Sequence, residues 1–161
     1  MLKKVLKPFK RRATFISIMQ YMIMAMLLVL LSVVVLMGVS FIIPFIRMRE
    51  YMIYGSMVIF AAALIIALIK RPSWKSVARL VDRHGLSERA QTALELEDRE
   101  DIYATMQRDD TISYIEATSP KIIKFSVPKR QVYIGLGLSI AIITLSIIPN
   151  PQRNIVKIRR D

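Results

Sequence analysis

The residues of this chain that could do chemistry gather in one polar stretch near its middle. His84, the only histidine, directly follows Asp82 and Arg83. A carboxylate close to an imidazole is a common arrangement for acid–base catalysis. Neither a nucleophile motif nor a glycine-rich phosphate loop accompanies these residues. The sequence therefore predicts no catalytic residue and no enzyme activity.

A run of carboxylates follows a few residues later. It consists of Glu95, Glu97, Asp98, Glu100 and Asp101. Carboxylate oxygens suit a hard cation, but the run lacks the spacing and the glycine turn of a calcium-binding loop. The chain has no cysteine, so a zinc site would lack its commonest sulfur ligands. We therefore expect no metal and no cofactor, and we interpret the run as a solvated helix face that offsets nearby arginines.

The elements that position these residues are predicted to be short helices. Ser73 is a suitable N-cap for a first helix, whose apolar residues Trp74, Val77, Ala78 and Val81 fall on one face. Gly85 is placed to end that helix in the left-handed conformation, and Ser87 can cap a second helix over 88–97. Two helices around a glycine turn result.

This pair of helices superficially suggests a helix-turn-helix, and a net charge of +12 would favour nucleic acid in a soluble chain. The phosphate contacts would be Arg79, Arg83 and Arg89. The second helix, however, carries Glu88, Glu95 and Glu97, which repel phosphate. We expect no nucleic-acid partner.

The rest of this polar segment is predicted to be one longer helix followed by a short stretch of extended chain. The helix covers roughly 98–117, with a stripe of Ile102, Met106, Ile112 and Ile115. Residues 121–127 are apolar and β-branched and lie between Pro120 and Pro128, which favours an extended lead-in to the next element.

The charged residues themselves are distributed very unevenly. Runs of 34, 19 and 22 residues, at 13–46, 51–69 and 131–152, contain no Asp, Glu, Lys or Arg. About 20 apolar residues in a helix cross the hydrocarbon core of a bilayer, and only helices satisfy their backbone within one segment there. The pattern excludes an ordinary soluble domain. The first run is too long for a cleaved signal peptide and is interpreted as a retained anchor.

Basic residues indicate which way the chain faces. With the N-terminus inside, 18 of the 24 lysines and arginines lie on the cytoplasmic side and 6 on the other. Cytoplasmic loops carry such an excess. We expect a multi-pass protein of the cell membrane with a cytoplasmic N-terminus, whose basic residues contact anionic lipid at the cytoplasmic face of the bilayer.

These observations predict an all-α membrane protein with three transmembrane helices and a small helical cytoplasmic insert between helices two and three. Arg47-Met48-Arg49-Glu50 is expected to form a tight turn, and Pro44 to mark the end of the first helix. The expected divisions are a basic cytoplasmic leader (1–12), a transmembrane hairpin (13–69), the insert (70–130), a third transmembrane helix (131–149) and an extracytoplasmic tail (150–161).

Small residues recur at four-residue spacing within the spans. The pairs are Ala63 and Ala67, Gly135 and Ser139, and Gly137 and Ala141. Such spacing lets helix backbones approach closely. It fits a dimer or partner interface, but we favour packing of the third helix against the second.

The stretch from Ala78 to Leu96 also resembles part of a known group of proteins. The resemblance rests on Asp82, Gly85-Leu86, Glu88-Arg89 and Thr92-Ala93-Leu94-Glu95. Similar segments occur in large bacterial membrane proteins of uncharacterised function, often encoded near a MoxR-type ATPase and von Willebrand factor A-like proteins. There, two membrane helices precede the segment and a third follows, before a long extracytoplasmic region. The resemblance implies a role in envelope assembly or stress, and a tail at 150–161 that begins a longer region.

We therefore expect a non-enzymatic membrane anchor or scaffold of the bacterial envelope, which docks a protein partner through its insert. The candidate contact, or the turn that organises it, is formed by Asp82, Arg83, His84, Gly85, Leu86 and Arg89. Gly85 and Leu86 are equally well explained as residues that shape the helix junction. The alternative function is a membrane subunit of a transporter complex, with Gln20 and Ser139 among its few intramembrane polar residues.

Overall fold

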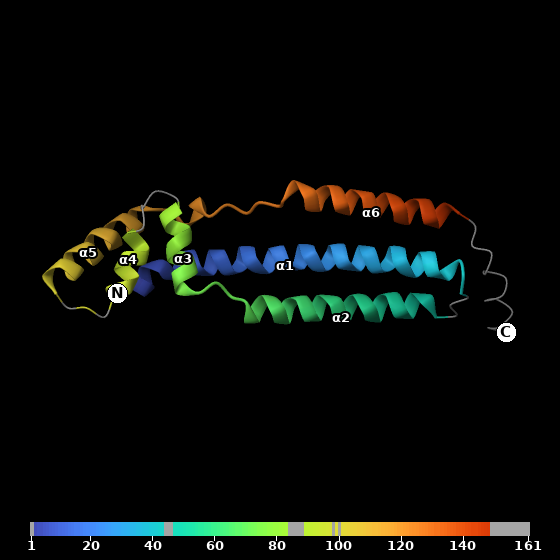
Figure 1. Cartoon of the computed structure of the whole chain (residues 1–161), viewed down its shortest axis with the longest axis horizontal. Helices are drawn as coiled ribbons and strands as arrows, with labels where there is room; N and C mark the ends of the chain where they lie inside the picture. Colours follow the sequence, from blue (N-terminus) through green and yellow to red (C-terminus); the bar gives the residue numbers. More distant parts are fainter. Residues whose placement is uncertain (1, 44–46, 84–88, 98, 100, 149–161) are drawn as a thin grey trace. The chain divides into compact units, whose positions relative to one another are not determined.

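The computed structural model describes residues 2–43, 47–83, 89–97, 99 and 101–148, and regular structure in these ranges is helical. The elements are α1 (Leu2–Ser40), α2 (Met48–Ile69), α3 (Trp74–Val81), α4 (Arg89–Glu95), α5 (Ile102–Ala117), the 3-10 helix η2 (Pro120–Ile122) and α6 (Lys129–Ile147) (Figure 1). The all-α class, with short helices between the second and third spans, is confirmed.

Three of these helices are long and apolar enough to cross a membrane, namely α1, α2 and α6. Their apolar side chains remain largely exposed in the isolated chain, as Met26, Val58 and Ile140 illustrate. Exposure of this extent suits hydrocarbon as the surrounding medium, because lipid tails solvate such side chains. The chain is a multi-pass membrane protein.

The chain forms two compact units. The first unit comprises Met1–Met19 and Ile69–Ser126, and the second comprises Gln20–Leu68 and Val127–Asp161. Helix α1 contributes its beginning to the first unit and the remainder to the second.

The core of the first unit is built on the start of α1. Leu2, Leu6, Phe9 and Ala13 are buried there. They pack with residues from α3, α4, α5 and the chain after it, which are Val77, Ala78, Val81, Ala90, Ala93, Ile115 and Ile123. Residues 1–12, expected from the sequence to be a separate basic leader, form from Leu2 on the first turns of the spanning helix. The difference arises because an apolar stripe at helical spacing lies among the lysines.

Short polar side chains decide where the helices of this unit begin. The hydroxyl of Ser73 accepts a hydrogen bond from the Ser76 N–H at 3.2 Å, which confirms the predicted N-cap. Asp101 caps α5 in the same way, through the Ala104 N–H at 2.7 Å. The helix predicted from about residue 98 therefore begins at Ile102.

The predicted apolar stripe of α5 is partly wrong. Ala104, Thr111 and Ile115 are buried, whereas Ile102 and Met106 are 83% and 69% exposed. The sequence pattern counted large apolar residues, but the surface against the core is formed mainly by smaller ones. Ile102 and Met106 therefore form an exposed apolar face on α5.

The chain between α5 and α6 follows the predicted extended path after one turn of η2, where Ser119 and Pro120 favour a 3-10 turn. Ile123 is buried in the first unit, and its carbonyl accepts a hydrogen bond from Arg12 Nε at 2.8 Å. This bond joins residues 111 positions apart in the sequence.

In the second unit, α1 ends at Ser40, and the N–H groups of Ile42 and Ile43 bond to the Val39 carbonyl. Pro44, expected to mark this end, lies outside the described residues. The segment Arg47–Glu50, expected to be a tight turn, is mostly the first turn of α2, which begins at Met48. Glu50 suits this position because a carboxylate favours a helix N-terminus.

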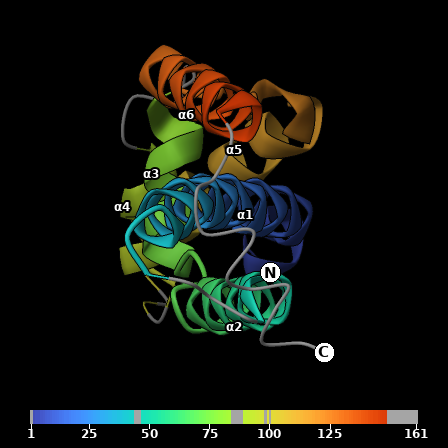
Figure 2. The ribbon, with the colours of Figure 1, turned by 90° about the vertical axis from the view of Figure 1, so that its right-hand side faces the viewer.

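The second unit places α1 between α2 and α6 (Figures 1 and 2). A Cβ atom added at Gly135 would lie 3.3 Å from Cδ2 of Leu27 in α1, and Gln131 Nε2 lies 3.7 Å from Sδ of Met24. The third span thus contacts the first through Gly135 and Gln131, a contact that the sequence did not predict. Helical periodicity gives the face of a helix but not its neighbour.

Candidate functional site

Asp82 organises the junction between α3 and α4. It continues the helical backbone after α3, and only 7% of it is exposed. Its two carboxylate oxygens accept hydrogen bonds from the Ala90 N–H at 2.9 Å and the Gln91 N–H at 3.0 Å. A carboxylate bonded to the first N–H groups of a helix stabilises that helix. Asp82 thus joins the end of α3 to the start of α4.

The other candidate contact residues are placed differently. Arg83 is exposed, and Arg89 is exposed at the start of α4 with its Nη1 3.1 Å from Oδ2 of Asp110. His84, Gly85 and Leu86 lie outside the described residues, as do Ser87 and Glu88. A partner contact in this region remains a prediction, with Arg83 and Arg89 as the accessible side chains.

The described part of the acidic run serves the fold. Glu95 pairs with Lys75 at 3.0 Å, Glu97 pairs with Lys3 at 2.7 Å, and Asp101 caps α5. Arg108 donates from Nη1 to the Glu97 carbonyl at 2.7 Å. Within the described ranges, no three His, Cys, Asp or Glu side chains converge as metal ligands do. Asp98 and Glu100 are outside those ranges.

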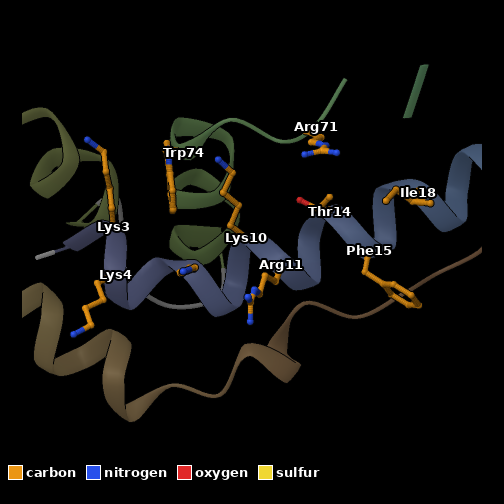
Figure 3. Close-up of a pocket in the computed structure, with 10 residues that line it drawn as sticks. Lys3, Lys4, Lys10, Arg11, Thr14, Phe15, Ile18, Arg71 and Trp74 are labelled. Atoms are coloured by element: carbon orange, nitrogen blue, oxygen red, sulfur yellow. The ribbon is translucent and has the colours of Figure 1, made fainter. Parts of the chain in front are cut away.

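A groove of about 760 Å³ lies along the start of α1 (Figure 3). Six cationic side chains line it: Lys3, Lys4, Lys7, Lys10, Arg11 and Arg71. Thr14, Phe15, Ile18 and Trp74 complete the lining. The ammonium group of Lys10 lies 4.0 Å from the centroid of the Trp74 ring, a cation–π contact. A surface of this composition attracts anions.

The groove and the core occupy opposite faces of α1. At about 100° per residue, the groove residues of α1 fall within about 140° of arc, and Leu2, Leu6, Phe9 and Ala13 fall within about 60° on the other side. Burial of the apolar face against α3, α4 and α5 therefore turns the lysines outward together.

Sequence reasoning missed this arrangement. The signal was present, since positions 2, 6, 9 and 13 have the spacing of one helical face. The apolar face was overlooked because the basic residues between these positions were interpreted only as an indicator of membrane orientation. No pattern of neighbouring residues predicts the hydrogen bond from Arg12 to Ile123 or the cap that Asp82 provides for α4.

A second surface of the first unit is the outward face of α5. Ile102, Tyr103 and Met106 are each at least two-thirds exposed there. Asp110, one turn beyond Met106, is the ion-pair partner of Arg89. Exposed apolar residues gathered on one helix face are typical of interaction sites. We refer to Arg89, Ile102, Tyr103, Met106 and Asp110 as the α5 surface.

The candidate packing residues of the spans lie in mixed surroundings. Ala67 is buried, Ala63 and Ala141 are half-buried, and a Cβ atom at Gly137 would meet nothing within 4 Å. Ser139 is half-buried, and its hydroxyl donates to the Gly135 carbonyl at 2.8 Å. Intramembrane hydroxyls in all three spans bond to a carbonyl three or four residues earlier in the same way: Ser32, Ser40, Ser56, Thr144 and Ser146.

Comparison of the chain with models of known protein families, with curated proteins and with solved structures finds no match. These comparisons give no support to the resemblance of the stretch Ala78 to Leu96, which therefore stays a hypothesis. The fold defines the class: a multi-pass membrane protein in which a small helical unit is built on the first span.

Proposed function

We propose that this protein is a non-enzymatic membrane anchor or scaffold of the bacterial cell envelope that docks a protein partner on its first unit. The observation that carries the proposal is the continuity of α1. One helix supplies Leu2, Leu6 and Phe9 to the core of the first unit and continues as the first span. A partner bound to this unit would therefore be joined to the first span with no loop between them in the chain.

The use of polar side chains in the first unit supports binding over catalysis. Asp82, Asp101 and Ser73 cap helices, and Arg12 and Arg108 bond to backbone carbonyls. Groups with such structural roles are held in place and are poorly suited to proton transfer or nucleophilic attack. The α5 surface, by contrast, offers apolar side chains beside an exposed ion pair, and it is our candidate for the docking contact.

The intramembrane hydroxyls support an anchor over a transporter subunit. Ser139 bonds to its own helix, as do Ser32 and Ser56. A hydroxyl engaged in this way satisfies a backbone carbonyl and is less available to a passing solute. A groove in the second unit is lined by Leu28, Leu31, Val35, Leu36, Ile59 and Ser32, and is therefore almost wholly apolar.

The proposal includes a cytoplasmic first unit, because 18 of the 24 basic residues then lie inside. The absence of cysteine makes this testable with single cysteines. Ser113 and Arg49 are both exposed, in α5 and α2 respectively. In intact cells, an impermeant maleimide should label Arg49→Cys at once and Ser113→Cys only after permeabilisation. The reverse pattern would overturn the proposed sidedness.

Docking is tested with a photo-crosslinking amino acid at Met106, and at the exposed Lys124 as the control position. We expect a discrete protein adduct from position 106 in intact cells and none from position 124. Arg89→Glu should abolish the adduct while leaving the folded signal of the first unit intact. Equal adducts at both positions would contradict a specific contact. Solute flux through liposomes containing the protein, abolished by Gln20→Ala, would favour the transporter alternative.

A further inference from the structure

The polarity of the groove beside α1 changes along the helix axis. Five of its six cationic side chains come from positions 3–11 of α1, and the sixth is Arg71, which Figure 3 shows near Thr14; Phe15 and Ile18 form the far end of the lining from α1. At a rise of 1.5 Å per residue, Lys7 and Ile18 are separated by about 16 Å along the axis. The charge-free run of this helix begins at Ala13, so the apolar end coincides with its entry into lipid.

We propose that this groove binds one anionic phospholipid. Its phosphate would lie among Lys7, Lys10, Arg11 and Arg71, and an acyl chain would follow Phe15 and Ile18. The site goes beyond the proposed docking of a protein and lies on a different surface from α5.

The composition of the groove favours a lipid over the other anions that it could attract. A free phosphate ion would use the cations but gain nothing from Phe15 and Ile18. An acidic protein segment would have to place its chain against the part of α1 that lies in hydrocarbon. A phospholipid already occupies that layer, and its headgroup and chain are arranged in the same order as the groove residues.

Trp74 gives a direct measurement because it lines the groove and is the only tryptophan. The full chain is placed in phosphatidylcholine nanodiscs that contain increasing amounts of a doxyl-labelled phosphatidylglycerol, which quenches the indole on contact. We expect quenching at a much lower mole fraction than with doxyl-labelled phosphatidylcholine. In the double variant K7Q/R11Q, the mole fraction for half-quenching should rise about 30-fold, as expected for the loss of two cations near a lipid phosphate.

The matched control is K129Q/R130Q, which removes two exposed cations at the start of α6. It should shift half-quenching by less than about threefold, and the charge-retaining variant K7R/R11K should behave like the wild type. Equal shifts in the two glutamine variants would show general attraction to anionic lipid and overturn the site. Displacement of the labelled lipid by millimolar inorganic phosphate would show a free-anion site instead.

The acyl-chain contact is tested with F15A/I18A, which should raise half-quenching by the phospholipid but leave the cations in place. An unchanged value would overturn the lipid assignment. Circular dichroism and the Trp74 emission maximum verify the fold of each variant. Should K7Q/R11Q fail to fold, the exposed Arg71→Gln replaces it, with an expected shift of about fivefold; no shift there would equally overturn the proposal.

Discussion

The two units of this protein place their large apolar side chains in different surroundings, and α1 contributes residues to both units. In the first unit, α1 buries its large apolar side chains, and Phe9 is only 2% exposed. Farther along the same helix, in the second unit, Met26 is 58% exposed. Both side chains are large and apolar, and both belong to α1. The difference is the surroundings: the first unit must exclude water from an apolar face, whereas the second can leave such a face to lipid.

Charged side chains of the first unit cap helices and reach across the fold, as Asp82 does to Ala90 and Arg12 does to Ile123. Hydroxyls bond to carbonyls of their own helix in both units, as Thr111 does in α5 and Ser139 and Thr144 do in α6. Such local bonds suit the spans in particular, because an unpaired polar group is costly in hydrocarbon.

Replacement of the buried phenylalanine should produce the largest effect. Phe9→Ala is expected to lower the free energy of unfolding of the first unit by about 3–5 kcal/mol, because it leaves a cavity. Phe15→Ala, the matched control, should change this value by less than about 0.5 kcal/mol. Urea titration in detergent with Trp74 fluorescence measures both. Similar values for the two variants would show that the first unit is not packed on α1.

The cap from Asp82 should be the next most important. Asp82→Ala removes two hydrogen bonds to the start of α4 and is expected to cost about 2 kcal/mol in the same titration. Arg83→Ala is the control, because that side chain is exposed and adjacent, and its effect should be within about 0.5 kcal/mol. If Arg83→Ala destabilised the unit as strongly as Asp82→Ala, the cap would not be the cause.

A smaller effect is expected in the second unit, where packing rather than exclusion of water holds the helices. Gly135→Leu should force α6 away from Leu27 and lower the stability of the helical bundle by about 1–3 kcal/mol. Gly137→Leu should be tolerated, since its Cβ meets nothing within 4 Å. Loss of helix–helix contact during titration with dodecyl sulfate measures the difference. Equal tolerance of both substitutions would indicate that α6 does not pack on α1 through Gly135.

The smallest effect concerns the ion pair of the α5 surface. A double-mutant cycle with Arg89→Ala and Asp110→Ala should give a coupling energy below about 1 kcal/mol, because both side chains are more than half exposed. The result matters for the docking proposal, since Arg89 can be exchanged without unfolding the unit only if the pair is weak. A coupling above about 2 kcal/mol would mean that the pair is a structural element of the fold.

Sequence alone sufficed for the features that depend on consecutive residues. The presence of three spans and the Ser73 cap follow from lengths and neighbours along the chain, because crossing a bilayer requires only enough apolar residues in a row. The buried face of α3 also followed, since Val77, Ala78 and Val81 repeat at helical spacing.

Tertiary structure alone decided which surfaces meet. It placed the stripe of Leu2, Leu6 and Phe9 in a shared core, and it brought Asp82 to the start of α4. It also chose α1 as the neighbour of Gly135. These outcomes join residues far apart in the chain, and each apolar face could have been covered by lipid, by a partner or by several helices. Periodicity identifies an apolar face that must be shielded from water, but the packing of the whole unit determines which residues bury it.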